Sequence, residues 1–199
     1  SHTISGQLPF NKPGGGGAGV NYMARLGASA KDGTVTVDAN GIHVVGATEV
    51  MLIVSAGTSL RSDGFADQVK RRLHAALGKG FEAIKSDAVE DHSSYMNRCK
   101  LELPAGPNSD LPTPQRVEQM QQDLDPQFAA LYFQFGRHLL VSGSRADSPL
   151  PLNLQGIWAD EYSTPWRGDF HTNINLQMNY WPAEVTGLPE SHLALMQFI

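Results

Sequence analysis

The run TVTVDANGIHVVGATEVMLIV, residues 34–54, decides the fold of the first part of the chain. β-Branched residues recur in 34–37, 42–45 and 50–54, and turn residues separate these segments. Such runs are typical of antiparallel strands, and residues 20–26 predict another. Asn40-Gly41 predicts a two-residue type I′ hairpin turn, which needs positive φ at both positions. We therefore expect antiparallel β structure that forms part of a β-sandwich.

Residues 13–17, Pro-Gly-Gly-Gly-Gly, precede this region. We interpret them as a mobile loop, because glycine loses the most backbone entropy on ordering. A phosphate-binding P-loop would need Lys-Ser/Thr after the glycines and then a helix, and neither follows here.

Helical periodicity replaces alternation after residue 62. Apolar residues at helical spacing predict helices over 65–77 and 81–96, and a Pro/Gly-rich linker follows at 104–112. Thr113-Pro114 and Asp125-Pro126 both look like an N-cap followed by proline in the first turn. The second signal opens a helix with a broad apolar face, formed by Phe128, Leu131, Tyr132, Phe135, Leu139 and Leu140. We interpret this face, with its neighbours Phe133, Arg137 and His138, as core; the alternative is an aromatic platform for a sugar.

Composition excludes several classes of protein. The 199 residues carry 15 Lys and Arg against 20 Asp and Glu, a net charge of −5, and basic clusters that would bind nucleic acid are missing. The longest fully apolar run, 50–54, is far shorter than the roughly 20 residues of a membrane span. A single cysteine, Cys99, excludes an internal disulfide and is interpreted as a small buried group. The seven histidines show no HExxH or other close pair, so we expect no metal and no cofactor.

Both ends suggest a piece of a larger protein. The chain opens Ser-His-Thr, without an initiator Met or a leader. Its last residues, 193–199, stop within an apolar helical pattern that has no stop signal. We therefore expect self-association of the isolated fragment, because the apolar helix faces would lack partners.

Residues 144–199 combine aromatic rings with side-chain amides. All three tryptophans lie here, at 158, 166 and 181, with the amides of Asn153, Gln155, Asn173, Asn175, Gln177 and Asn179. Planar amides suit vicinal hydroxyls, and indole faces suit sugar rings. If 173–177 is extended or a tight turn, Asn173, Asn175 and Gln177 share one side with His171, and Ile174 and Leu176 anchor the other. The alternative is that the amides tie down a long loop through bonds to the backbone.

These residues resemble a known family. The motifs NLQGIW at 153–158, Pro165-Trp166 and HTNINLQMNYWPAE at 171–184 resemble the start of the catalytic domain of glycoside hydrolase family 95, the inverting α-L-fucosidases. Residues 131–142, Ser144-Arg145 and 49–60 are similar to its first barrel helix and the last strands of its N-terminal sandwich. The resemblance implies an α+β multidomain architecture: the end of an antiparallel β-sandwich at 1–62, a helical linker at 63–112 and the first helices of an (α/α)6 barrel at 113–199.

The resemblance also implies a site. The family's two active-site asparagines fall on Asn173 and Asn175, and a substrate-contacting histidine falls on His171; we add Trp158 and Asp169 as expected sugar contacts. An amide is not basic near pH 7, so Asn175 would orient water for an aspartate. In the family a glutamate is the general acid. That glutamate and the aspartate would both lie beyond residue 199, so we expect the fragment alone to be inactive.

The expected substrate is a fucosylated glycan, with an α-1,2 linkage, and the alternative sugar is a related L-sugar such as α-L-galactose. The family implies secretion or a periplasmic location. The alternative function is a non-catalytic module that binds glycans or another chain. Of the local carboxylates, Asp160 and Glu161 are expected to be solvated, and Glu184 to lie in a first helical turn. Asp169 is expected to pair with Arg167 or to organise His171.

Overall fold

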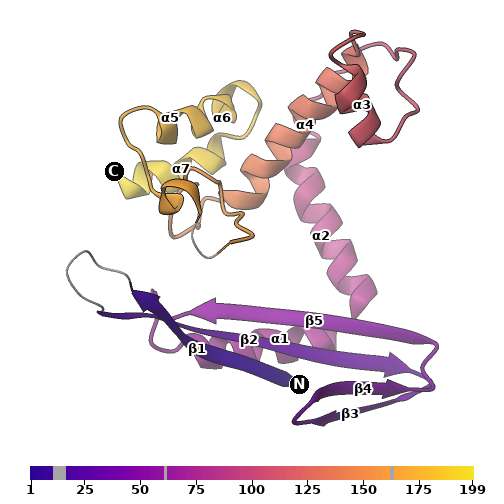
Figure 1. Ribbon diagram of the computed structural model, residues 1–199, viewed down its shortest axis with the longest axis vertical. Helices are drawn as coiled ribbons and strands as arrows, with labels where there is room; N and C mark the ends of the chain where they lie inside the picture. Colours follow the sequence, from indigo (N-terminus) through magenta and orange to yellow (C-terminus); the bar gives the residue numbers. More distant parts are fainter. Residues whose placement is uncertain (11–16, 61, 162–163) are drawn as a thin grey trace. The chain divides into compact units, whose positions relative to one another are not determined.

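The computed structural model describes residues 1–10, 17–60, 62–161 and 164–199. The strands are β1 (His2–Phe10), β2 (Gly17–Lys31), β3 (Thr34–Asp38), β4 (Gly41–Val45) and β5 (Glu49–Thr58). The helices are α1 (Phe65–Lys79), α2 (Phe81–Met96), α3 (Thr113–Gln119), α4 (Pro126–Gly143), α5 (Asn175–Tyr180), α6 (Pro182–Val185) and α7 (Pro189–Phe198). The chain forms two compact units, residues 1–88 and 89–199 (Figure 1). It is an α+β chain with small antiparallel sheets, and the domain boundaries expected from the sequence stay predictions.

The first unit is built on an antiparallel sheet in the order β1-β2-β5, and β3 pairs with β4 in a hairpin. Each segment predicted to be a strand lies in one, and β1 was not predicted. Helix α1 runs along one face of the sheet (Figure 1) and buries Val69 and Leu73. Gly27 and Gly57 make this close packing possible, since a Cβ at Gly57 would lie 2.9 Å from Val69.

The opposite face of β5 is apolar and exposed. Val50, Leu52 and Val54 are 47%, 60% and 69% exposed, and Ile4 of β1 is 60% exposed. Strand alternation directs these β5 residues away from α1. One side of the sheet is therefore covered by a helix, and the other side has an apolar surface open to solvent in residues 1–88.

The predicted turn of the β3-β4 hairpin is wrong in detail. Asp38 pairs with Gly41, so the two loop residues are Ala39 and Asn40, and neither has a positive φ. The Asp38 carboxylate accepts hydrogen bonds from the backbone N–H groups of Asn40 (2.7 Å) and Gly41 (3.1 Å). The hydrogen bond from Asn40 N is the main reason that the pKa of Asp38 lies below its ordinary value. The His43 side chain and Gly41 N lower the pKa further. The aspartate, rather than an Asn-Gly pair, closes this turn. Of the predicted mobile loop at 13–17, residues 13–16 lie outside the described residues, and Gly17 is the first residue of β2.

The second unit packs α4, α5, α6 and α7 around one core. Its buried apolar residues are Leu140, Val141, Leu152, Leu176, Tyr180, Ala183, Leu188 and Leu195. The predicted cap at the start of α4 is confirmed, because the Asp125 carboxylate accepts from Phe128 N at 3.0 Å. It also pairs with the buried Arg116 guanidinium at 2.9 Å, which holds the pKa of Asp125 below its ordinary value. The cap predicted at Thr113 is wrong, because α3 begins at Thr113 itself and has no side-chain cap.

The aromatic face of α4 does not form core in this chain, contrary to our interpretation. Leu131, Tyr132 and Phe135 are 46%, 71% and 50% exposed, and of the six apolar residues in the predicted face only Leu140 is buried. Arg137, in contrast, is 2% exposed. Its guanidinium contacts the carbonyl oxygens of Tyr95, Met96, Cys99 and Thr186 at 2.8–3.1 Å. The buried arginine joins α4 to the ends of α2 and α6.

Candidate functional site

The loop that carries the candidate site is fixed by a tight turn at Asn153–Gly156. The backbone N–H groups of Asn153 and Gly156 each donate to the other's carbonyl at 3.0 Å. The Asn153 side chain accepts from Gln155 N at 2.8 Å. Gly156 has φ +70°, and a Cβ there would lie 2.6 Å from the Trp158 ring. A glycine is required at this position both by the backbone and by the ring that covers it.

Four of the six amides in the segment stabilise the loop itself. Besides Asn153, the Gln155 amide donates to Pro165 O (3.0 Å), the Gln177 amide to Thr172 O (2.5 Å) and the Asn179 amide to Asn153 O (3.0 Å). These contacts are the side-chain to backbone bonds of the loop-fixing alternative. That alternative is confirmed for these four residues.

Asn173 and Asn175 differ from the other four. Both are exposed, and among the described residues neither side chain makes a hydrogen bond. Asn175 is the first residue of α5, and residues 172–174 form the turn before it. The two amides that the sequence marked as catalytic are therefore the two that remain available to a ligand.

The expected alternation through 173–177 is wrong beyond the turn. Because α5 starts at Asn175, residues 175 and 177 point in different directions around a helix. Ile174 is 45% exposed and anchors nothing, whereas Leu176 is 2% exposed and reaches the core. Gln177 is therefore removed from the polar side that Asn173 and Asn175 were expected to share with it.

His171 and Asp169 lie close to each other just before this turn. The imidazole Nε2 of His171 is 3.9 Å from the Asp169 carboxylate, and the His171 carbonyl accepts from Leu176 N at 3.0 Å. The other Asp169 oxygen accepts from Phe170 N at 2.7 Å. Of the two partners weighed for Asp169, the structure places it beside His171. Two residues earlier, Trp166 and Arg167 have positive φ values of 50° and 59°, a strained backbone for side chains with a Cβ.

Trp158 lies at a separate hollow of about 600 Å³. Its ring covers Gly143 and Gly156 and is 42% exposed. The polar residues in the wall are Arg137, Gln155, Asn179 and Thr186, and further aromatic residues come from α4, namely Tyr132, Phe133 and Phe135. The hollow thus combines Trp158 with the aromatic stripe of α4. His171, Asn173 and Asn175 are not among its lining residues, so the predicted site residues fall in two places.

The remaining carboxylates behave as expected. Asp160 and Glu161 are exposed. Glu184 lies in the first turn of α6 and accepts a 2.6 Å hydrogen bond from His192, which holds the pKa of Glu184 below its ordinary value. Within the described ranges, no group of three or more His, Cys, Asp or Glu side chains could hold a metal ion. None of the described helices is long and apolar enough to cross a membrane.

The core position expected for Arg137 is confirmed, but its hydrogen-bond partners and the buried Tyr180 hydroxyl were not predicted from the sequence. Tyr180 lies 2.9 Å from the Ser144 hydroxyl and accepts from Leu152 N at 2.8 Å, and burial raises its pKa. The only sequence signal for this network is a tyrosine, with its hydroxyl group, at a core position of a helix. The network of Ser144, Tyr180 and Leu152 stabilises the loop and is not assigned a ligand contact.

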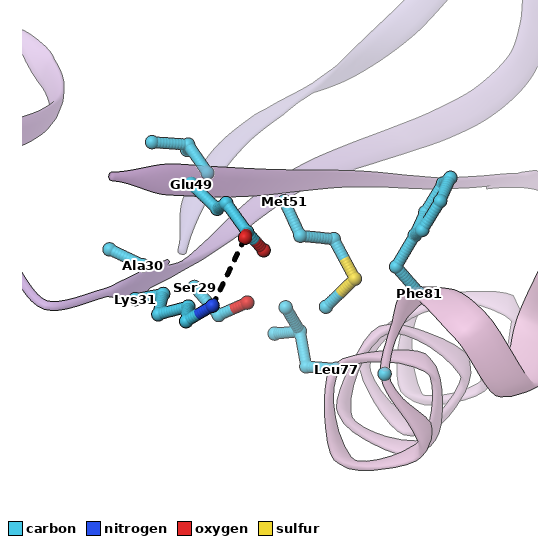
Figure 2. A pocket seen from close by; sticks show the side chains of 9 residues that line it. Ser29, Ala30, Lys31, Glu49, Met51, Leu77 and Phe81 are labelled. Carbon is cyan, nitrogen blue, oxygen red and sulfur yellow. Dashed lines mark hydrogen bonds and ion pairs between the residues drawn. The ribbon is translucent and has the colours of Figure 1, made fainter. Parts of the chain in front are cut away.

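A further hollow, of about 530 Å³, lies in the first unit (Figure 2). Met51, Leu77 and Phe81 form its apolar walls, and the Lys31–Glu49 ion pair of 3.1 Å crosses its edge. None of the residues that we marked as site candidates lies in it.

Comparisons with known proteins identify the family of the chain. The model of the glycosyl hydrolase family 95 catalytic domain matches residues 80–199, which include all the candidate residues. The chain belongs to glycosyl hydrolase family 95. Relatives are "Probable alpha-fucosidase A" of Aspergillus niger (36% identical, 86% of this chain and 24% of the relative) and of Aspergillus oryzae (33%, 79% and 24%). "Alpha-L-fucosidase 2" of Arabidopsis thaliana is 42% identical over 58% of this chain and 14% of its own length.

These family 95 relatives are much longer than the chain. Residues 1–199 span about a quarter of the two Aspergillus proteins. The family match begins at residue 80, directly before α2, and includes all of α2 as well as α3 to α7.

Proposed function

We propose that this chain is part of a glycosidase that hydrolyses terminal α-L-fucosides of glycans, with an α-1,2 linkage as the preferred substrate. The observation that carries the proposal is the family 95 match over the segment that holds the two unpartnered amides. The names of the three relatives support fucose as the sugar. Because the chain spans about a quarter or less of their length, the activity is assigned to the full-length protein.

In this proposal Asn175 and Asn173 hold the attacking water. An amide can accept from and donate to a water molecule, but it has no useful basicity near pH 7. Inversion requires a base for the water and an acid on the opposite face of the sugar. We assign both roles to carboxylates outside residues 1–199, an aspartate behind the water and a glutamate as acid. Residues 1–199 alone are then inactive.

Sugar contacts come from His171 and Asp169, which precede these amides, and from Trp158 at the separate hollow. His171, with the Asp169 carboxylate 3.9 Å away, can donate to a hydroxyl, and Trp158 offers an exposed apolar face. No cofactor and no metal ion takes part in this reaction.

The finer architecture is part of the same proposal. The exposed face of β5, with Leu52 and Val54, fits a sheet that a second sheet covers in a β-sandwich. The exposed Leu131 and Phe135 of α4 fit a first barrel helix that further helices of an (α/α)6 barrel would cover. Secretion or a periplasmic location follows from the extracellular glycans on which such an enzyme acts.

A non-catalytic glycan-binding module is the second candidate. It is favoured by the hollow at Trp158, because this hollow lies apart from Asn173 and Asn175. A binding module would retain a fucosylated oligosaccharide without cleaving it.

The deciding experiment incubates the full-length protein with a 2′-fucosylated oligosaccharide and follows the anomeric protons by NMR. We expect free L-fucose to appear first as the β-anomer, because inversion of an α-fucoside gives β. Release of the α-anomer would overturn the inverting mechanism. Binding without release of fucose would favour the binding module.

A further inference from the structure

Two imidazole rings from different helices meet in the second unit. Nε2 of His92, on α2, lies 2.9 Å from Nδ1 of His138, on α4. The Ser142 hydroxyl is 3.3 Å from the same Nδ1. Both histidines are half-buried and Ser142 is exposed, so solvent reaches the pair. The residues are 46 positions apart, which is why spacing along the sequence did not reveal them.

The distance between the two nitrogens fits one particular coordination geometry. Imidazole nitrogens bind first-row metals at about 2.0–2.1 Å. Two nitrogens 2.9 Å apart would then enclose an angle of about 90° at the metal. Such an angle is that of neighbouring ligands in a tetragonal or octahedral complex, which Cu²⁺ and Ni²⁺ prefer.

The charged groups near His92 and His138 also bear on which metal ion the two imidazoles would bind. Asp91, next to His92 on α2, is held by the Arg145 guanidinium at 2.6 Å and is therefore neutralised. The ligands that remain are two neutral nitrogens and a hydroxyl, a set that suits copper and nickel and not the oxygen-seeking Ca²⁺ and Mg²⁺. Phe135 stacks on His138 with ring centroids 6.2 Å apart.

We infer that His92 and His138 form a two-imidazole site for a divalent transition-metal ion, Cu²⁺ most strongly and Ni²⁺ next. Ser142 lies beside the ion, and water completes its coordination. The ion takes the place of the hydrogen bond that joins the two rings in its absence. The site lies in α2 and α4 and uses none of the residues assigned to fucoside hydrolysis.

The test titrates CuCl₂ into the full-length protein, without a histidine tag, and follows binding by calorimetry and by electron paramagnetic resonance. We expect one Cu²⁺ site whose spectrum shows coupling to two nitrogens. His92→Gln and His138→Gln should each weaken this site at least tenfold. His74→Gln, which changes an exposed histidine of α1, is the matched control and should leave the affinity unchanged.

Circular dichroism and the unfolding midpoint of each variant, measured without metal, establish that it folds. Loss of the two-nitrogen signal in a folded His92→Gln or His138→Gln variant supports the site. Equal Cu²⁺ affinity in the wild type and both variants would overturn it, as would a wild-type spectrum without coupling to two nitrogens. If one variant does not fold, the other variant and the wild-type spectrum decide the outcome.

Discussion

Replacing Arg137 by methionine removes the buried guanidinium that joins three segments of the second unit. Methionine keeps most of the chain length and loses every donor. In this variant the Tyr95 carbonyl still accepts a hydrogen bond from Arg98 N, and the Cys99 carbonyl still accepts one from the Gln134 amide. Among the described residues, the carbonyls of Met96 and Thr186 have no other partner.

Each buried acceptor left without a partner costs about 1–3 kcal/mol. With two such carbonyls, Arg137→Met should lower the free energy of unfolding by about 2–6 kcal/mol. Urea denaturation of the full-length protein measures this change. Arg98→Met is the matched control, because its ion pair with Glu190 is exposed and should contribute about 1 kcal/mol or less. If both variants lost the same small amount, the guanidinium would not join these segments as described.

Three further predictions concern the loop, the pH dependence and the isolated chain. Gly156→Ala places a Cβ 2.6 Å from the Trp158 ring at a positive φ; it should destabilise the protein by about 2–4 kcal/mol and alter tryptophan fluorescence, whereas Gly78→Ala, in open space, should do neither. The hydrogen bond from His192 lowers the pKa of Glu184 from 4.5, so the ionised carboxylate stabilises the folded protein above about pH 4.5. This stabilisation is lost as the pH falls through the pKa of Glu184 in the folded protein. Glu184→Gln should therefore reduce the loss of stability on acidification, measured as the free energy of unfolding against pH. Residues 1–199 expressed alone should self-associate in sedimentation experiments through the exposed face of α4, and a monodisperse, cooperatively unfolding monomer would contradict this expectation.

Local patterns predicted the elements that depend on local physics. Runs of β-branched residues between turns gave the later strands, and Asp125-Pro126 gave the start of α4 with its cap. Strand β1, HTISGQLPF, has too few apolar residues in alternation to be recognised and is formed by pairing with β2. The segment 175–180, NLQMNY, has weak helix propensity, and packing of Leu176 and Tyr180 into the core makes it helical.

The sequence named the residues of the candidate site but not their arrangement, and their roles stay predictions. Resemblance to the family marked Asn173 and Asn175, and only the structure separates them from the amides that fix the loop, such as Asn179. Contacts between distant segments leave no periodic signal, so neither the partners of Arg137 nor the approach of α2 to α4 could be seen in the sequence.

The central claim is that Asn175 positions the water that cleaves the fucoside. The most direct measurement compares Asn175→Ala and Asn179→Ala in the full-length protein, with kcat and KM on a 2′-fucosylated oligosaccharide. Because the Asn179 amide donates to Asn153 O, its variant should act mainly through stability. Asn175→Ala should lower kcat by about 10²–10⁴-fold, the usual contribution of positioned proton-transfer groups, with little change in KM. A near wild-type kcat in an Asn175→Ala protein with an unchanged unfolding midpoint would contradict the account.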